Sequence, residues 1–184
     1  MIKNYIKHFK TITEHKWVVM RLCFKCGLYK RGLLHDLSKY GKTEFKASAM
    51  HFNGKRSPID VEKDIYGYSF AWQHHKGHNP HHWEYWIDNI GTYKNTPIEI
   101  PMEYVIEMIC DWVGAGIVYS GNNVDFDSPY AEPMEYFMAH LHKRIFHPKT
   151  LGKTIAYLKI IEEYGVNRFC REARLSLKLR RVMK

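Results

Sequence analysis

The sequence of 184 residues predicts an all-α protein. Apolar residues recur at helical spacing, and Pro and Gly stand where helices would begin and end. No run of four or more residues alternates convincingly between polar and apolar side chains next to a hairpin turn, so no sheet is predicted. Hydrophobic residues make up 45% of the chain, which is enough for a core and excludes a disordered protein.

The expected helices of the first half each have a start or stop signal. Four are predicted: from Thr13 through 20–26 to a stop at Gly27, 29–39 with a stop at Gly41, Thr43 to Asn53-Gly54, and Pro58 to His75 with a stop at Gly77. His15 would then lie in the first turn of its helix. The segment 78–89 contains Asn79-Pro80 and is expected to turn and then form one or two helical turns.

The second half begins with the most apolar helix. Pro101 starts it, and it is expected to end near Gly121. A loop over 121–129 follows, and three more helices are predicted over 133–146, 148–164 and 166–181. The loop is the one candidate seam, so the chain is divided into 1–125 and a C-terminal helical extension, 126–184, packed on it as one structural unit.

Composition limits the compartment and the partners. With 28 Lys and Arg against 19 Asp and Glu, the formal charge is +9, which favours polyanionic partners. The amino terminus has no apolar stretch typical of a signal peptide, and four cysteines in a chain of this length do not indicate disulfides, so a cytoplasmic protein is expected. The segment Tyr104 to Tyr119 is too short to span a bilayer, and Glu107 and Asp111 interrupt it, so no membrane partner is expected.

Candidate metal ligands occur in a fixed order along the helices. They are His15, the dipeptide His35-Asp36, a histidine cluster over 74–82, and Asp111. Imidazole and carboxylate bind divalent transition metals, and helical bundles build metal sites from several helices. A lone histidine such as His15 is by itself more often an ordinary core or surface residue. Asp111 differs, because a carboxylate within the most apolar helix needs a partner or a cation.

These residues resemble the HD-domain superfamily of metal-dependent phosphohydrolases. The run His35-Asp36-Leu37-Ser38-Lys39 is similar to the recurrent His-Asp-Ile-Gly-Lys of that superfamily, and the resemblance covers about residues 10 to 120. The runs HDLSKYGKTEF and HHKGHNPHHWEYW are also similar to a group of small uncharacterised bacterial and phage proteins, which indicates no substrate. The resemblance implies an HD-domain-like helical bundle with extra C-terminal helices.

The resemblance also implies a set of site residues. The first metal would be held by His15, His35, Asp36 and Asp111, and a second metal by His75 and His82, with His74, His78 and His81 as alternatives that spacing does not separate. One or two ions of Mn, Fe, Co, Ni or Zn are expected, with Mg as the alternative. Asp36, Lys39 and Glu44 are the expected catalytic residues, and Lys39, His78 and His81 the expected substrate-binding residues.

The predicted function is that of a metal-dependent phosphohydrolase, in which a metal-activated water attacks a nucleotide or another small phosphorylated metabolite. A basic nucleic-acid-binding protein with a structural or vestigial metal site is the alternative from another class, and a di-iron HD-type oxygenase is the third. The basic helix over 171–181 is compatible with nucleic-acid binding, although its leucines are expected to pack on the bundle. The sequence leaves the oligomeric state open.

Other signals are interpreted as structural. Cys23 and Cys26 have the spacing of half a zinc site but no second pair, and are expected to be helix thiols of which one is packed. The aromatic residues around the cluster are expected mainly in the core, with stacking on a nucleobase as the alternative: Trp72, Trp83, Tyr85 and Trp86. The remaining histidines are expected on the surface: His8, His51, His140, His142 and His147.

Overall fold

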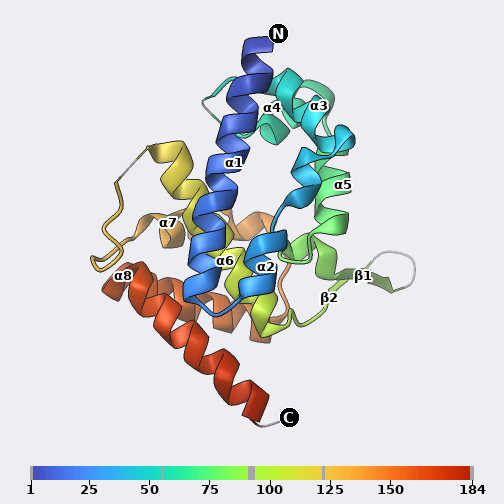
Figure 1. The fold of residues 1–184 in the computed structure, drawn as a ribbon. Coiled ribbons are helices and arrows are strands. Elements are labelled where there is room, and N and C mark those ends of the chain that lie inside the picture. The colour runs from blue at the N-terminus through green and yellow to red at the C-terminus, as the bar shows by residue number, and fades with distance from the viewer. Residues whose placement is uncertain (1, 55, 91–93, 122, 183–184) are drawn as a thin grey trace.

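The computed structural model describes residues 2–54, 56–90, 94–121 and 123–182, and over these ranges the protein is an all-α bundle with one small hairpin (Figure 1). The predicted all-α class is confirmed. The α-helices are α1 (Ile2–Lys25), α2 (Tyr29–Leu34), α3 (Lys42–His51), α4 (Pro58–Tyr66), α5 (Phe70–His78), α6 (Met102–Ser120), α7 (Glu132–His140) and α8 (Pro148–Val182). Three short 3-10 helices are η1 (Leu37–Tyr40), η2 (Trp83–Trp86) and η3 (Leu141–Lys143).

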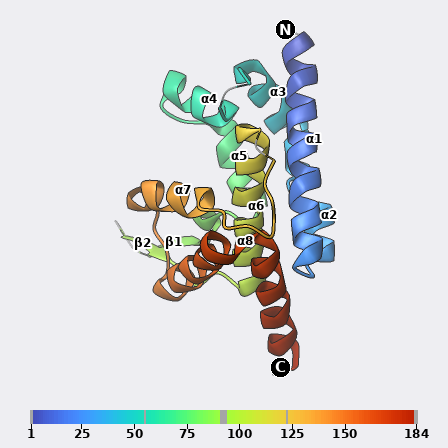
Figure 2. The same ribbon diagram turned by 90° about the vertical axis from the view of Figure 1, so that its left-hand side faces the viewer.

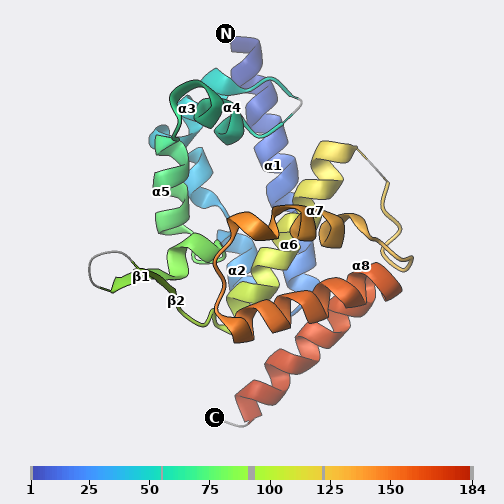
Figure 3. The same cartoon turned by 180° about the vertical axis from the view of Figure 1, so that it is seen from behind.

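Helix α6 is the centre of the bundle. It lies between α1 and α7, and α8 passes below it (Figures 2 and 3). Its predicted limits are confirmed, since it follows Pro101 and ends before Gly121, which has a left-handed backbone. The helix is buried almost continuously from Val105 to Gly114. A residue that projects from this stretch therefore points into protein on nearly every side.

Helix α1 is longer than expected. It begins at Ile2 rather than at Thr13, so Thr13 is not a cap and His15 lies in the middle of the helix. The reason is that the buried face of α1 already starts at His8 and continues with helical spacing through Ile12 and His15 to Leu22. The predicted stop is confirmed, because Gly27, two residues after the last residue of the helix, takes a φ of +83°.

The expected helix from Pro58 to His75 is two helices. Gly67 takes a φ of 78° and ends α4, and Ser69 then caps α5 by accepting a hydrogen bond from the backbone N–H of Trp72 at 2.9 Å. The predicted stop at Gly77 is also wrong, because α5 continues to His78. The break turns α5 away from α4, so the two helices line different sides of the cavity described below.

A two-stranded antiparallel hairpin contradicts the expectation of no sheet. Strand β1 (Ile87–Ile90) pairs with β2 (Lys94–Pro97), with Ile87 opposite Pro97 and Asp88 opposite Thr96. Four-residue strands are too short to show a clear alternation in sequence. The hairpin projects from the bundle (Figure 1), whereas the helical turn expected just before it is confirmed as η2.

The C-terminal helices pack on the same core as the N-terminal ones. Predicted helix 133–146 is shorter in the structure, as α7 followed by η3, and the two helices expected over 148–164 and 166–181 are the halves of α8. They meet at Gly165, whose φ is +80° and where an added Cβ would lie 2.6 Å from the backbone oxygen of Ser128. One buried cluster joins Val19, Ile109, Phe137 and Phe169 across both parts of the chain. The division at residue 125 itself stays a prediction.

Among the described helices, none combines the length and the apolar character that crossing a membrane requires.

Candidate metal centre

The four residues expected at the first metal converge in the structure. His15 comes from the middle of α1, His35 and Asp36 from the turn after α2, and Asp111 from the middle of α6. His15 Nε2 lies 2.9 Å from Asp111 Oδ1, and His35 Nε2 lies 3.4 Å from both Asp111 Oδ1 and Asp36 Oδ2. All four contribute one possible ligand atom to a group that fits within 4.8 Å. They are separated by up to 96 residues in sequence, so only the fold brings them together.

An interruption of the expected helix directs the Asp36 side chain into this group. The expected helix 29–39 ends at Leu34, and Asp36 takes a φ of 53°, the only positive φ of a non-glycine residue that the structure describes. Lys16 of α1 donates hydrogen bonds to the backbone oxygens of Leu33 and His35, at 2.8 and 2.7 Å. These bonds use carbonyl groups that the end of the helix leaves unpaired. The left-handed conformation costs about 1–2 kcal/mol, and it turns a carboxylate inward instead of continuing the helix.

A second group of possible ligands shares Asp36. The Nε2 atoms of His75 and His81 each lie 3.4 Å from Asp36 Oδ1, and His82 Nε2 lies 2.8 Å from His75 Nε2. His75 and His82 were the expected ligands here, and His81 was an alternative ligand as well as an expected substrate-binding residue. The structure places all three histidines in one group within 4.8 Å. Asp36 therefore presents one oxygen to each group.

Glu107 is the main residue of the centre that was not among the site residues expected from the sequence. It is buried one turn before Asp111 on α6, and its Oε1 lies 3.1 Å from His35 Nδ1 and 3.4 Å from His81 Nδ1. A carboxylate that accepts from Nδ1 holds the imidazole with Nε2 directed at the metal side, which is how such residues orient metal ligands. The signal was present, since Glu107 and Asp111 interrupt the same apolar helix four residues apart.

Glu44 has the equivalent place behind the second group. It is buried at the start of α3, and its two oxygens lie 2.8 Å from His75 Nδ1 and 2.7 Å from His74 Nδ1. Ser38 and Asn79 also contact His75 Nδ1, at 3.3 and 3.1 Å. Glu44 is not among the residues that line the cavity, so the geometry differs from its expected contact with the reacting water.

Lys39 lines the cavity, and His78 does not. Lys39 Nζ is 2.5 Å from Asp36 Oδ2, and the side chain lines the cavity. His78 is exposed, its Nδ1 donates to the backbone oxygen of His74, and its ring stacks on His74 with centroids 4.1 Å apart. Because α5 continues through Gly77, these two histidines share an outer face of the helix, and His78 is not among the residues that line the cavity. Its expected contact with substrate stays a prediction.

The charge states of the carboxylates and imidazoles at the centre suit the binding of a cation. Burial alone would raise the pKa values of Asp36 and Asp111, but the histidines around them and, for Asp36, Lys39 hold both pKa values well below 3.8. Burial lowers the pKa of His15 and, with the neighbouring histidines, that of His82, so both are neutral at pH 7. These are the charge states in which carboxylate and imidazole bind metals.

His35 shows how strongly the centre attracts positive charge. Burial would lower its pKa, but Asp36, Asp111 and Glu107 outweigh burial and raise the pKa to about 10. A divalent ion would satisfy the same carboxylates without a proton on His35.

Several buried atoms at the centre have no hydrogen-bond partner among the described residues. They include His35 Nε2, His81 Nε2 and Asp36 Oδ1. Buried polar groups are rarely left in this state, and each of these three is an atom that can bind a metal. The donor set of imidazoles and carboxylates could therefore hold a metal ion.

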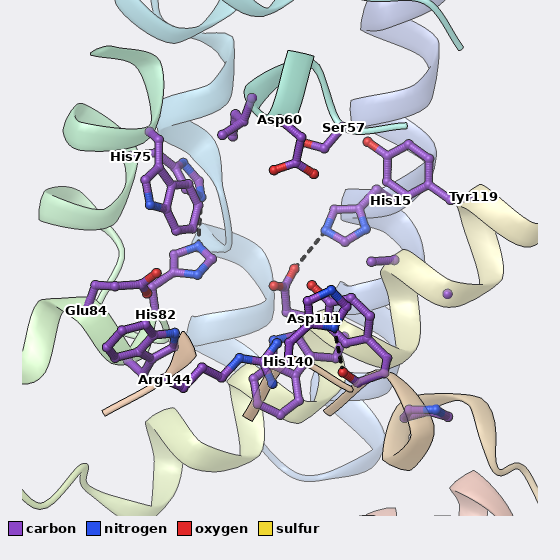
Figure 4. A pocket seen from close by; sticks show the side chains of 18 of the residues that line it. His15, Ser57, Asp60, His75, His82, Glu84, Asp111, Tyr119, His140 and Arg144 are labelled. Atoms are coloured by element: carbon purple, nitrogen blue, oxygen red, sulfur yellow. Dashed lines mark hydrogen bonds and ion pairs between the residues drawn. The ribbon is translucent and has the colours of Figure 1, made fainter. Parts of the chain in front are cut away.

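Four residues of the centre, His15, His75, His82 and Asp111, line a cavity of about 620 Å³, while His35, Asp36 and His81 are not among its lining residues. Figure 4 shows His75 and His82 on one side and His15 with Asp111 on the other, while Ser57 and Asp60 lie along one edge and His140 and Arg144 along the opposite edge. Trp72 and Trp83 also line the cavity, so these two aromatic residues face the site, while Tyr85 is exposed and Trp86 donates to the backbone oxygen of Pro80. A cavity of this size accommodates a small organic ligand.

Two further expectations change. His8 is not a surface residue, since it is buried against Phe45 and Phe52, and His140 lines the cavity. Both Cys23 and Cys26 are buried rather than one of them: Cys23 lies on α1, which packs against α6 and α8, and Cys26 follows the last residue of that helix. Cys26 Sγ lies 3.8 Å from Cys110 Sγ.

A family model described as a family of unknown function, DUF5662, matches residues 4–157. No curated protein and no solved structure matches the chain. The matched range includes both ligand groups, Glu44, Glu107 and every residue that lines the cavity.

Proposed function

The chain belongs to the DUF5662 family of unknown function, and we propose that it is a metal-dependent phosphohydrolase of the HD-domain type, acting on a nucleotide or another small phosphorylated metabolite. The observation that carries the proposal is Asp36, whose two oxygens face two histidine-rich groups, and each group contributes residues to the lining of one cavity. A carboxylate placed between two ligand groups is typical of sites that hold two ions close together.

The ligands are assigned from the distances. His15, His35, Asp36 and Asp111 would hold the first ion, and Asp36, His75, His81 and His82 the second. When bound, divalent ions lower the pKa of a water molecule and offset the negative charge of a phosphoryl group. The order of the ligands along the chain, with His35-Asp36 in the middle, supports the HD-type assignment.

The surrounding residues prepare the ligands. Glu107 holds His35 and His81, and Glu44 holds His75, so these are positioning residues. Lys39 keeps Asp36 ionised and brings a positive charge to the cavity wall, where it would contact a phosphoryl oxygen of the substrate. Trp72 and Trp83 line the cavity, where their rings exclude water on one side and would contact the organic part of the substrate.

The test combines metal analysis with a screen of phosphorylated substrates. We expect the purified protein to carry one or two equivalents of a divalent metal and to hydrolyse p-nitrophenyl phosphate or a nucleotide when supplied with Mn, Fe, Co, Ni, Zn or Mg. Asp36→Asn keeps the size of the side chain but weakens both ligand groups, so metal content and activity should fall by at least 100-fold. Glu107→Gln should lower metal affinity by about 10–100-fold, because it loosens His35 and His81.

Asp64→Asn is the matched control, because Asp64 is an exposed carboxylate paired with Arg56 outside the cavity. Its metal content and activity should equal those of the wild type. The proposal fails if the wild type carries no stoichiometric metal or if Asp36→Asn changes neither quantity. Turnover that requires iron and dioxygen would instead identify an oxygenase, and salt-dependent polynucleotide binding without turnover a nucleic-acid-binding protein.

A further inference from the structure

Arg144 is a cation held in the wall of the cavity by aromatic rings. It follows η3, and its guanidinium carbon lies 4.8 Å from the ring centroid of Trp112, 5.2 Å from that of Tyr136 and 5.3 Å from that of Phe137. Its Nη1 donates to the backbone oxygen of Phe137 at 3.4 Å. Rings and a carbonyl fix the position of the group without neutralising its charge.

No carboxylate forms an ion pair with Arg144 in the part of the chain that the structure describes, although Glu84 lines the same cavity. Other arginines do form such pairs: Arg31 with Glu107, Arg56 with Asp64, and Arg168 with Glu172. Arg144 is also half-buried, and burial lowers its pKa from 12.5. Glu84 and the Tyr136 side chain act on Arg144, but no carboxylate is in ion-pair contact with it among the described residues. A cation that is partly removed from water and has no ion-pair contact gains from an anion that enters the cavity.

Arg144 lies on a wall separate from the ligand groups. In Figure 4 it lies with His140 on the edge opposite Ser57 and Asp60, while the histidines and Asp111 occupy the space between the two edges. Lys143 lines the same wall and adds a second positive charge. His140 lies on the same wall, and its Nδ1 donates to the backbone oxygen of Tyr136. The cavity of about 620 Å³ is much larger than a phosphoryl group, so it has room for a group at each end.

We infer that Arg144 and Lys143 bind a second anionic group of the substrate, so that the substrate is a phosphate ester with another phosphate or carboxylate at its far end. The inference rests on the proposed function for the phosphoryl group at the metal centre. The second anion site itself needs no metal, because its cations and rings come from α6, α7 and the segment after α7. Its guanidinium can donate two parallel hydrogen bonds to either kind of anion.

A binding experiment tests the site without catalysis. The full-length protein is depleted of metal with a chelator and titrated with inorganic phosphate in a calorimeter. The carboxylates of the metal-free centre repel phosphate, so we expect one equivalent to bind at Arg144. Arg144→Gln should weaken binding at least tenfold, Arg144→Lys should weaken it less, and Arg168→Gln, which removes an equal charge outside the cavity, should have no effect.

The lysine variant keeps the test valid if the glutamine variant does not fold, which circular dichroism shows directly. The inference is overturned if wild-type protein binds no phosphate without metal, or if folded Arg144→Gln and Arg144→Lys bind it as tightly as the wild type. Phosphate binding that depends on Arg144 in a protein without any hydrolytic activity would support this site while contradicting the proposed function.

A second experiment distinguishes the two kinds of anion. The metal-loaded enzyme is assayed with alkyl monophosphates, with alkanediol bisphosphates of increasing length, and with phosphorylated hydroxy acids of matched length. We expect kcat/KM to be at least tenfold higher for one length of a doubly anionic substrate than for the matched monophosphate, and Arg144→Gln to bring this ratio close to one. Equal kcat/KM values across the three series would overturn the inference.

Discussion

Asp36 has a role that depends on its backbone as well as on its carboxylate. Helix α2 ends at Leu34, and the left-handed backbone of Asp36 directs its side chain toward His15 of α1 and His75 of α5. In a continuous helix over 29–39 the carboxylate would follow the helix surface, and the two ligand groups would not share it. The left-handed backbone of Asp36 is therefore what allows both ligand groups to share its carboxylate.

His8 shows the opposite case, a buried histidine outside the metal centre. Its ring lies 5.4 Å from the rings of Phe45 and Phe52, and its Nδ1 has no hydrogen-bond partner among the described residues. Burial, with a smaller contribution from Lys39, lowers its pKa from 6.5 to about 4. The folded protein therefore keeps this ring neutral at a pH where the unfolded chain protonates it.

We predict that His8 makes the protein less stable as the pH falls from about 6.5 to about 4. In this range the unfolded chain binds a proton on His8 that the folded protein does not bind, so the free energy of unfolding decreases. His8→Leu should make that decrease smaller when urea unfolding is measured at pH 7 and pH 5. His142→Leu, at an exposed position, should leave it unchanged, and equal decreases in His8→Leu and wild type would contradict the prediction.

At the scale of an element, α6 connects the metal centre to the packing of the bundle. Glu107, Asp111 and Gly114 lie at positions that follow one another along the same face of the helix, which is the face that meets α1. Gly114 allows this approach, since an added Cβ would lie 2.6 Å from Val19 Cγ2 and 3.7 Å from His15 Nδ1. The distance between α1 and α6 thus sets the position of His15 relative to Asp111.

We predict that Gly114→Ala destabilises the protein by about 1–2 kcal/mol, because the cost of overpacking against fully buried Val19 exceeds the gain in helix propensity. Metal affinity should fall with it, since α1 must shift and carries His15. Gly152→Ala is the matched control on α8, where an added Cβ meets no atom within 4 Å and stability should rise by about 0.5–1 kcal/mol. Equal changes in stability in Gly114→Ala and Gly152→Ala would contradict the prediction that Gly114 is needed for the close approach of α1 and α6.

At the scale of the whole molecule, the centre concentrates negative charge inside a basic protein. The formal net charge is +9, yet Asp36, Glu107 and Asp111 are buried close to one another. Their mutual repulsion is offset by Lys39 and by a proton on His35 when no other cation is present. Bound divalent ions would offset it more completely and would bind the folded state only.

We predict that metal stabilises the folded protein. At a free metal concentration of 100 times Kd, the gain is about 2.7 kcal/mol for one site, which corresponds to about 5–10 °C in Tm for a chain of this length. Treatment with a chelator should lower Tm by this amount in a thermal unfolding experiment, and adding metal back should restore it. In Asp36→Asn the difference should disappear, and a wild-type Tm that does not respond to the chelator would contradict the prediction.

The candidate ligands could be predicted from the sequence through its resemblance to the HD-domain superfamily, which rests on residue types in a fixed order along the chain. His15, His35, Asp36 and Asp111 are residue types that bind metals, and a carboxylate within an apolar helix needs a partner wherever that helix lies. The helical class followed from local signals, since apolar spacing, Pro and Gly act within a few residues.

Only the tertiary structure decided which histidines of 74–82 face the centre, and it placed His81 inside and His78 outside. It also brought Glu107 behind two imidazoles and Arg144 into the cavity wall. These contacts join segments tens of residues apart, and their geometry depends on how α1, α5, α6 and α7 pack. The sequence by itself thus determined the residue types available to the site, while packing between distant helices decided which atoms meet.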